Sequence, residues 1–501
     1  MESASATAPT GRSDVLTAFD PRTGEQLAQY PVRSPAEVAR AVRSAHATQN
    51  WWGELGFGAR KRLLLDWRRQ IARNTGELVE ILRGETGKPE ADATLEVILA
   101  VENLDWAARN AERTLGRKRL STGWFTRNQH ASVGYLPLGV VGVLGAWNNP
   151  VFTPMSSIAY AMAAGNAVVF KPHELCSGVG TWLADSWAAV APENPVLQAI
   201  TGDGRTATAL CKAEVDKIAY AGPEAGGREV ISLCAQTLTP VVLEHSGKGS
   251  MIVHVDAVLD AAAEAAVFGA MANAGQNASG IQRCYVADSV FDDFLARVAE
   301  RAARLRPGAD NRASYGPMIN AAQVEVVHRQ VRDALARGGH AVLGGLDSFR
   351  DPYVEPIVLA EVPEDSIAIT GEGIGPVLVV NRVADLADAV TRVNAAANGI
   401  AVTIFTRDIP SAEFVAEQLK VGVVTVNSST AFTGIPALPF GGVGEYGQGH
   451  SHGQQGLREF SRTMSIARRR YRTPVRLSTF DRRPGHLQTA KALFRLRHGR
   501  G

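Results

Sequence analysis

The sequence predicts an α/β protein with doubly wound parallel sheets, and three observations indicate this fold class. Short, continuous apolar runs with turn residues nearby occur at Gly139–Gly145 and Ala167–Phe170, which is typical of strands buried on both faces. The segment between them, residues 154–164, is helix-like, so the order is strand, helix, strand. Further strand-like runs at Lys217–Tyr220 and Pro240–Leu243 alternate with helical segments, which extends the parallel sheet.

The chain before this region is predicted to be helical. Ser34 is followed three residues later by Glu37, with apolar residues from Val38 onward; this is the pattern of a capping box at a helix start. Arg60–Arg73 is predicted as another helix, and the helical section continues to about Leu115. The first residues are small and polar and lack the apolar stretch of a signal peptide, which predicts a disordered leader over residues 1–16.

After Lys248 the alternation of strands and helices restarts. Helix-like segments are expected over residues 258–272, 290–304 and 321–337, with a strand-like run at 283–286 between the first two. This pattern predicts a second α/β domain, with the boundary near residue 248.

Length and composition indicate a multidomain protein and argue against several function classes. The chain has 501 residues with 45% apolar content, more than one domain requires. Its net charge is +2, from 52 basic and 50 acidic residues, which argues against wholesale nucleic-acid binding. No run approaches the roughly 18 apolar residues that span a bilayer. The cysteines form no CxxC pair, which predicts reduced thiols in a cytoplasm: Cys176, Cys211, Cys234 and Cys284.

Short blocks rich in glycine and proline follow one another in a set order. One such block alone would be weak evidence. Together, in this order and at these separations, the blocks resemble the aldehyde dehydrogenase superfamily over residues 17 to 470. The blocks are Pro137–Gly142, Ala146–Pro150, Gly165–Glu174, Leu243–Lys248, Gly275–Gln276, Glu372–Val377 and Leu438–Gly444.

The resemblance implies a domain plan and an assembly. Residues 17–118 and 138–247 correspond to an NAD-binding domain, and 248–463 to a catalytic domain. A small β oligomerisation element combines 119–137 with 464–475 and implies a homodimer or homotetramer. A basic tail, 476–501, completes the chain.

The resemblance also implies the chemistry. In the family a cysteine thiolate attacks an aldehyde, hydride leaves for a nicotinamide, and water hydrolyses the thioester to give a carboxylic acid. Asn148 matches the asparagine whose amide, with the backbone N–H of the nucleophile position, stabilises the oxyanion. Glu244, which precedes position 278 by 34 residues, matches the general base.

Position 278 is the family's nucleophile position, and alanine occupies it. Gly275, Gln276 and Arg283 stand at the spacing of the family pattern, whose cysteine is replaced by Ala278. Alanine has no nucleophile, so oxidation by the family route is expected to fail. Cys284 is predicted to be a buried strand residue rather than a relocated nucleophile. Two explanations are open: deliberate removal of the thiol to trap a substrate complex, or a natural non-catalytic or repurposed member.

The cofactor site is implied by the same blocks and departs from the family in places. Lys171 and Glu174 match the pair that binds the adenosine ribose, and a carboxylate there favours NAD over NADP because it repels a 2′-phosphate. The block from Gly222 to Gly227 matches the helix start that binds the pyrophosphate. Trp147 belongs to the block before Asn148, Glu372 matches the glutamate of the nicotinamide ribose, and no metal is implied. The departures are Pro223, His245, Ser246 and Ile374, and Pro223 predicts weaker cofactor binding because proline has no N–H.

The C-terminal tail is strongly basic. From Ile466 onward the chain contains eleven Lys and Arg residues and one acidic residue, Asp481. Residues 486–498 are a candidate amphipathic helix. Contact with an anionic membrane surface, a solvated or subunit-packed tail, and a nucleic-acid tail are three interpretations. The residues around Phe152, Phe268 and Phe432 are expected to line the aldehyde pocket without naming the aldehyde. A cofactor- or aldehyde-binding pseudoenzyme and a thiol-independent reductase remain alternative functions.

Overall fold

The computed structural model describes residues 14–245, 247–310, 312–395, 400–429, 431–473 and 475–499. Ser246 and residues 1–13 of the predicted leader lie outside these ranges. The chain divides into a large unit, residues 14–114 and 137–461, and a small unit, residues 115–136 and 462–499. The leader was predicted to reach residue 16, but strand β1 (Val15–Phe19) already pairs antiparallel with β2 (Gln26–Pro31), so this boundary was two residues too late.

The first sheet of the large unit is six-stranded, and five of its strands are parallel. Its order is β19-β9-β8-β5-β6-β7, with β19 antiparallel at one edge. The predicted unit of strand, helix and strand is confirmed, since α5 (Phe152–Ala164) connects two fully buried strands. The strands are β5 (Val140–Leu144), β6 (Ala167–Lys171), β7 (Leu197–Ala199), β8 (Lys217–Gly222), β9 (Val241–His245) and β19 (Gly447–Gln448).

The helices predicted before this sheet are present and pack around it. Ser34 caps α1 reciprocally with Glu37: the Ser34 hydroxyl accepts from the Glu37 N–H, and the Glu37 carboxylate accepts from the Ser34 N–H at 2.9 Å. Trp187 packs edge-on against Trp52 and Trp67, with ring centroids 5.5 and 5.8 Å apart. The helices before the sheet are α1 (Pro35–Glu54), α2 (Phe57–Arg73), α3 (Thr75–Thr86) and α4 (Glu90–Leu115). The helices α6 (Ser177–Ala188), α7 (Gly204–Cys211) and α8 (Glu224–Ala235) follow its strands β6, β7 and β8.

The second sheet of the large unit is seven-stranded, with the order β12-β15-β16-β11-β10-β17-β18. Along the chain it begins with β10 at Gly249. All pairs are parallel except the edge pair of β12 with β15. The strands are β10 (Gly249–Val253), β11 (Ile281–Ala287), β12 (His340–Leu343), β15 (Ile357–Ala360), β16 (Val377–Val383), β17 (Ala401–Phe405) and β18 (Val423–Val426).

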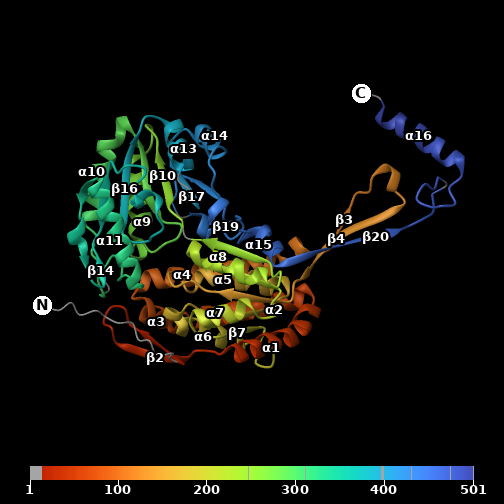
Figure 1. Ribbon diagram of the computed structural model, residues 1–501, viewed down its shortest axis with the longest axis horizontal. Helices are drawn as coiled ribbons and strands as arrows, with labels where there is room; N and C mark the ends of the chain where they lie inside the picture. Colours follow the sequence, from red (N-terminus) through yellow and green to blue (C-terminus); the bar gives the residue numbers. More distant parts are fainter. Residues whose placement is uncertain are drawn as a thin grey trace. The chain divides into compact units, whose positions relative to one another are not determined.

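Helices cover both faces of the second sheet, as the doubly wound prediction requires. One apolar cluster joins the sheet to α9, α10 and α11, and another joins its opposite face to α13 and α14 (Figure 1). The three helices predicted in this domain agree with α9, α10 and α11 to within one residue at each end. The remaining elements are α9 (Leu259–Met271), α10 (Phe291–Ala303), α11 (Ala321–Ala336), α12 (Ile367–Thr370), α13 (Leu386–Ala395), α14 (Ile409–Ala416), α15 (Gly453–Glu459), β13 (Phe349–Arg350) and β14 (Tyr353–Val354).

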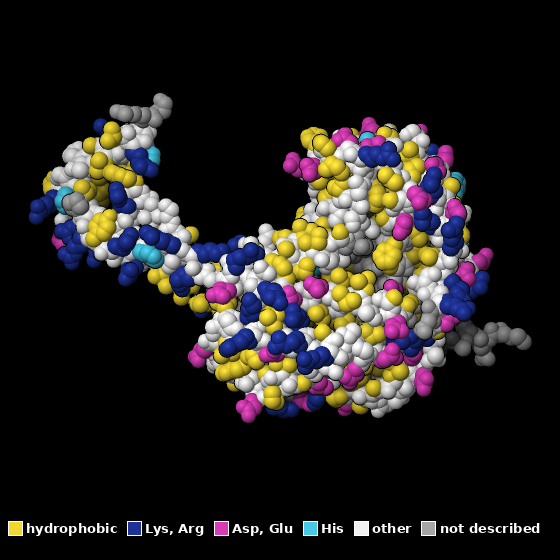
Figure 2. Space-filling model, turned by 180° about the vertical axis from the view of Figure 1, so that it is seen from behind, with side chains coloured by type: hydrophobic (Ala, Val, Ile, Leu, Met, Phe, Trp, Pro, Cys, Tyr) yellow, Lys and Arg dark blue, Asp and Glu magenta, His cyan; other side chains and the backbone are white. Residues whose placement is uncertain are grey.

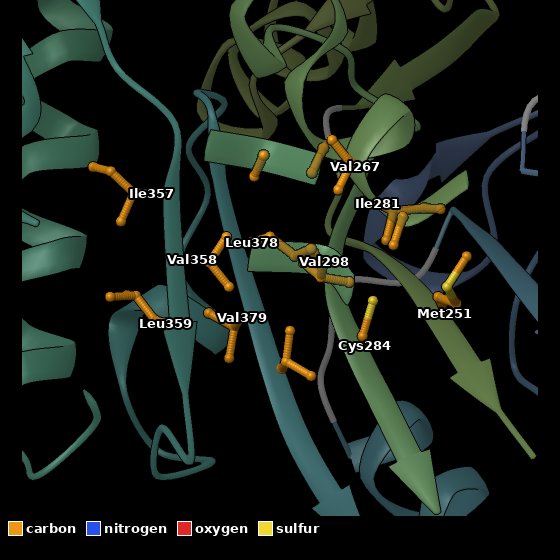
Figure 3. Packing of buried hydrophobic residues seen from close by; sticks show 14 of the residues in the cluster. Met251, Val267, Ile281, Cys284, Val298, Ile357, Val358, Leu359, Leu378 and Val379 are labelled. Carbon is orange, nitrogen blue, oxygen red and sulfur yellow. The ribbon is translucent and has the colours of Figure 1, made fainter. Parts of the chain in front are cut away.

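Cys284 lies in the core of the second sheet, as predicted. Its side chain points into the cluster formed with Met251, Ile281 and Val298 (Figure 3) and is fully buried. Burial raises the pKa of this thiol far above its ordinary value. The other three cysteines are also buried free thiols.

The small unit contains a three-stranded sheet and the C-terminal helix. The sheet has the order β20-β4-β3, from β3 (Lys118–Leu120), β4 (Gln129–Pro137) and β20 (Ser461–Arg469). The Asn128 carbonyl accepts from the Arg470 N–H at 2.8 Å. Helix α16 (Pro484–His498) confirms the helix predicted in the tail. Exposed apolar side chains accompany the basic residues (Figure 2), among them Phe480, Phe494 and Leu496.

Surface charge on the large unit is mixed: Lys and Arg side chains are interspersed with Asp and Glu on the face shown in Figure 2. Across the described ranges, every helix is too short or too polar to cross a lipid bilayer.

Candidate active site

A cavity of about 680 Å³ opens in the large unit and receives residues from both α/β domains. It lies beside the carboxyl ends of β5, β6, β8 and β9, where open parallel sheets bind ligands. Among the predicted site residues, seven line it: Asn148, Glu244, Ala278, Trp147, Lys171, Gly222 and Glu372. Glu174 and Gly227 do not line it: Glu174 is exposed beside it, and Gly227 packs under His245.

Ala278 follows a loop whose backbone is held in an unusual conformation. Asn273, Ala274 and Gly275 have φ angles of 55°, 54° and 69°, a left-handed run that non-glycine residues avoid. A Cβ at Gly275 would collide with the Gly375 carbonyl, so only glycine fits there. A strained backbone conformation of this kind persists only where surrounding contacts hold it in place. The loop leads directly to residue 278, which lies in the cavity wall.

Gln276 holds this loop from inside. It is fully buried, and its amide donates to the carbonyls of Asn273 and Pro317 at 2.9 and 3.2 Å. Its side-chain oxygen accepts from the Ile319 N–H at 2.8 Å. Because its donor and acceptor groups are all satisfied, the position of residue 278 is defined by packing rather than by a ligand.

Asn148 joins the loop after β5 to the loop that carries Ala278. Its Nδ2 donates to the Gln276 carbonyl at 3.0 Å, and Asn273 donates in return to the Asn148 carbonyl at 3.1 Å. The Asn148 amide has a second N–H, and the residue lines the cavity. The structure therefore brings Asn148 and position 278 together, as the sequence predicted.

Glu244 is the penultimate residue of strand β9 and lines the same cavity. The Ser451 hydroxyl donates to its carboxylate at 3.3 Å. Burial raises the pKa of Glu244 to about 7, and the hydrogen bond from Ser451 opposes this rise. A carboxylate with a pKa near neutrality is suited to accept or donate a proton.

The Glu244→Gln variant is expected to change how stability depends on pH. Folding raises the pKa of Glu244 from 4.5 to about 7, so its stabilising contribution is full below pH 4.5 and is lost as pH rises through about 7. Relative to the unmodified chain, the variant should gain up to about 3 kcal/mol between pH 4 and pH 8.5. Denaturant unfolding at both pH values measures this gain. A difference in stability that stays constant with pH would contradict it.

The side of the cavity at the end of β6 carries two ionisable side chains, Lys171 and His173. Burial lowers the pKa of Lys171, against the attraction of Glu174 and Asp203. Burial and the nearby Lys171 charge lower the pKa of His173 to about 3, so its imidazole is neutral. His173 lines the cavity and was missed, although it stands in the block that contains Lys171 and Glu174.

The start of α8 faces this cavity, and a carboxylate already contacts it. Pro223 is the N-cap residue, and the next N–H, that of Glu224, donates to Glu372 at 3.1 Å. Burial raises the pKa of Glu372. An anion at a helix N-terminus is stabilised by the free N–H groups. Glu372 therefore occupies the helix end that the sequence assigned to a pyrophosphate.

An apolar wall forms beside Asn148. Trp147, Cys176, Ile319 and Ile374 pack together, and the Cys176 thiol lies 3.5 Å from the Trp147 carbonyl. Ile374, which replaces the family's aromatic residue, thus fills space within this wall.

The opposite part of the cavity is aromatic. Phe152, Phe432 and Phe440 line it, and the rings of Phe432 and Phe440 stack with centroids 5.5 Å apart. The expectation for Phe268 was wrong: this half-exposed residue projects from α9 into a separate cavity of about 320 Å³. Sequence reasoning missed Ser156 and His452 on the main cavity, because no spacing connects them.

No group of three or more His, Cys, Asp or Glu side chains within the described residues is arranged to hold a metal ion.

The sequence of almost the whole chain is similar to that of a known protein family, in agreement with the site geometry. The model of the aldehyde dehydrogenase family matches residues 8–466. The chain belongs to this family. The curated 4,4'-diapolycopene aldehyde oxidase of Methylomonas sp is 34% identical over 462 residues, which cover 92% of this chain and 87% of that protein. A putative succinate-semialdehyde dehydrogenase [NADP(+)] of Mycolicibacterium smegmatis is 30% identical, covering 89% and 87% of the two chains.

Solved aldehyde dehydrogenase structures share the fold. An NAD-dependent aldehyde dehydrogenase from Sinorhizobium meliloti matches with a TM-score of 0.88 and 28% identity, covering 93% of each chain. An NADP-dependent glyceraldehyde-3-phosphate dehydrogenase from Bacillus halodurans, complexed with NADP, matches with a TM-score of 0.86 and 28% identity, covering 91% of this chain and 96% of that one. The α/β fold class is thereby confirmed. Both cofactors occur among these proteins, so similarity alone does not choose between NAD and NADP.

Proposed function

We propose that this aldehyde dehydrogenase binds NAD and an aldehyde but lacks the nucleophile that oxidises the aldehyde to a carboxylic acid. The observation that carries this proposal is Ala278, which lies in one cavity with Asn148 and Glu244. A cysteine at position 278 would attack the carbonyl carbon and form a thiohemiacetal. An alanine methyl group forms no such bond, so the covalent step is lost.

The rest of the machinery supports binding without turnover. Asn148 offers an amide N–H, and the backbone N–H of residue 278 is kept whatever side chain stands there, so both oxyanion donors are retained. Glu244, with its pKa raised to about 7, is suited to act as the base for the attacking group and for water. An engineered substrate trap and a natural divergence are both compatible with this arrangement.

The residues around the cavity fit a dinucleotide. Lys171 lines the cavity, and with the exposed Glu174 it matches the family's ribose-binding pair. A Cβ at Gly222 or Gly226 would crowd the Tyr220 hydroxyl beside the start of α8. A bound nicotinamide cofactor supplies the acceptor for the hydride. Glu372 has to release the Glu224 N–H for a phosphate to reach it, and Pro223 offers no N–H, so we expect binding weaker than the family norm.

The Glu174→Gln variant tests the choice of NAD. In the unmodified chain we expect tighter binding of NAD than of NADP, because the Glu174 carboxylate repels a 2′-phosphate. Loss of that charge should improve NADP binding by about 5- to 10-fold relative to NAD. Calorimetric titration with both dinucleotides measures the ratio, and Glu193→Gln is the distant matched control. An equal ratio of NAD affinity to NADP affinity in the unmodified chain and both variants would show that Glu174 does not select the cofactor.

A second candidate function is reduction of a non-covalently bound aldehyde by NADH, a direction that needs no thiol. The raised pKa of Glu244 favours it, because a carboxyl that is partly protonated near pH 7 can donate a proton to the developing alkoxide. Consumption of NADH by the unmodified chain with an aldehyde would support this reductase. Binding of both ligands with no turnover in either direction would support a pseudoenzyme.

We also propose that the small unit makes subunit contacts in a homodimer or homotetramer, since its sheet carries exposed apolar side chains such as Leu120 and Ile466. The excess of basic residues in the tail supports a peripheral contact with an anionic membrane surface as an additional role. Sedimentation of the full chain with and without anionic vesicles distinguishes the two. A cytoplasmic location remains a prediction from the reduced cysteines.

A further inference from the structure

Ser156 and His452 form a buried polar pair in the wall of the main cavity. The Ser156 hydroxyl on α5 lies 3.0 Å from His452 Nε2, at the start of α15. Both residues line the cavity, and both are almost fully buried, with 4% and 2% of their surfaces exposed. The other ring nitrogen of His452, Nδ1, has no hydrogen-bond partner within the described part of the chain.

The backbone of His452 is strained. Its φ of 59° and ψ of 169° fall in a region that is essentially reserved for glycine. The preceding residue, Ser451, donates to Glu244. Residues 451 and 452 are therefore held so that one contacts the proposed base and the other contacts Ser156. Strain of this kind is retained where a particular side-chain position is needed.

Aromatic rings enclose the imidazole and fix its orientation. Its centroid lies 5.9 Å from Phe152, 6.1 Å from Tyr160 and 6.2 Å from Phe440. Burial lowers the pKa of His452 to about 4, so the ring is neutral at pH 7. A neutral imidazole carries one N–H, and a hydroxyl has one donor and two acceptor positions.

The Ser156 hydroxyl has capacity beyond this pair. It lies 3.2 Å from the Phe152 carbonyl, to which it can donate. With that proton directed to Phe152 and one lone pair accepting from His452 Nε2–H, the second lone pair is available to a group in the cavity. Around it the cavity is apolar and aromatic, so a polar substituent bound here is recognised by this hydroxyl.

We propose that Ser156, oriented by His452, is a specificity determinant that accepts a hydrogen bond from a hydroxyl group of an aldehyde with an apolar or aromatic body. His452 acts as a positioning residue. The inference rests on the proposed function, because it concerns the aldehyde held in the same cavity.

Binding of three probes by the unmodified chain, in the presence of NAD, tests the proposal. The probes are 4-hydroxybenzaldehyde, 4-methoxybenzaldehyde and benzaldehyde; the first donates a hydrogen bond, the second only accepts one, and the third does neither. We expect the hydroxylated aldehyde to bind about 3- to 10-fold more tightly than the other two, which is the effect of one hydrogen bond. Calorimetry measures the three dissociation constants.

Variants assign this preference to the pair. Ser156→Ala and His452→Phe should abolish it, whereas His452→Gln, which keeps a side-chain N–H, should restore part of it. Ser157→Ala, next to Ser156 but outside the main cavity, is the matched control and should keep the preference. Thermal unfolding shows whether each variant is folded. A preference retained in Ser156→Ala, or equal binding of the methoxy and hydroxy probes, overturns the assignment. Failure of all three probes to bind the unmodified chain overturns the proposed function and this inference with it.

Discussion

The Ala278→Cys variant is expected to oxidise aldehydes with NAD, whereas the unmodified chain is not. The side chain at this position is delivered to the cavity by the strained loop at Asn273–Gly275 and by the buried Gln276, none of which requires a cysteine to form. Glu244 lines the same cavity with a pKa near 7 and can take the proton of an added thiol. We expect a rate increase on the order of 10³-fold or more, in line with the cost of removing a nucleophile elsewhere.

Formation of NADH with a panel of aldehydes measures this gain. Ala278→Ser is the matched control, since its hydroxyl is similar in size to a thiol but far less acidic, so a carboxylate such as Glu244 does not convert it to a strong nucleophile; it should remain inactive. Adding Cys284→Ala to the Ala278→Cys chain should leave activity in place, because Cys284 is buried in the second sheet. If the Ala278→Cys chain formed no NADH with any aldehyde, the disabled-enzyme interpretation would be refuted and a pseudoenzyme favoured. NADH formation by the unmodified chain would refute the assigned role of position 278.

Asn148→Ala, made in the Ala278→Cys chain, is expected to lower kcat by about 10²- to 10³-fold, the usual loss for one oxyanion donor. The Asn148 amide is 3.0 Å from the Gln276 carbonyl and so lies beside the backbone that leads to position 278. Because charge builds on the aldehyde oxygen only during attack, kcat and kcat/KM should fall together. Steady-state kinetics gives both quantities.

Asn149→Ala is the matched control for this loss. The Asn149 side chain points to other partners: it donates to Asn277 at 3.3 Å and accepts from Lys88 at 3.0 Å. We expect a smaller effect on kcat from its removal. A rise in KM alone in Asn148→Ala, or equal losses in the two variants, would assign Asn148 a role in loop structure instead of oxyanion stabilisation.

The sequence predicted the fold class and much of the site because both are recorded in local pattern and order. Continuous apolar runs identify buried strands whatever they pack against, and Ser34 with Glu37 marks a helix start through contacts three residues apart. The order of the glycine-rich blocks predicted that Asn148, Glu244 and position 278 meet in one place, and the cavity contains all three. Alanine at position 278 is visible in the sequence alone.

The tertiary structure decided which side chains meet across the chain. Ser156 and His452 are 296 residues apart, and no periodicity connects them; their contact depends on how α5 and α15 pack. Glu372 reaches the start of α8 across 148 residues, and Phe268 is excluded from the main cavity by the outward face of α9. The local sequence pattern determines which helices and strands form and in which order, because the formation of each element depends on residues close together in the sequence. The polar contacts within the cavity are fixed only when elements from both domains close around it.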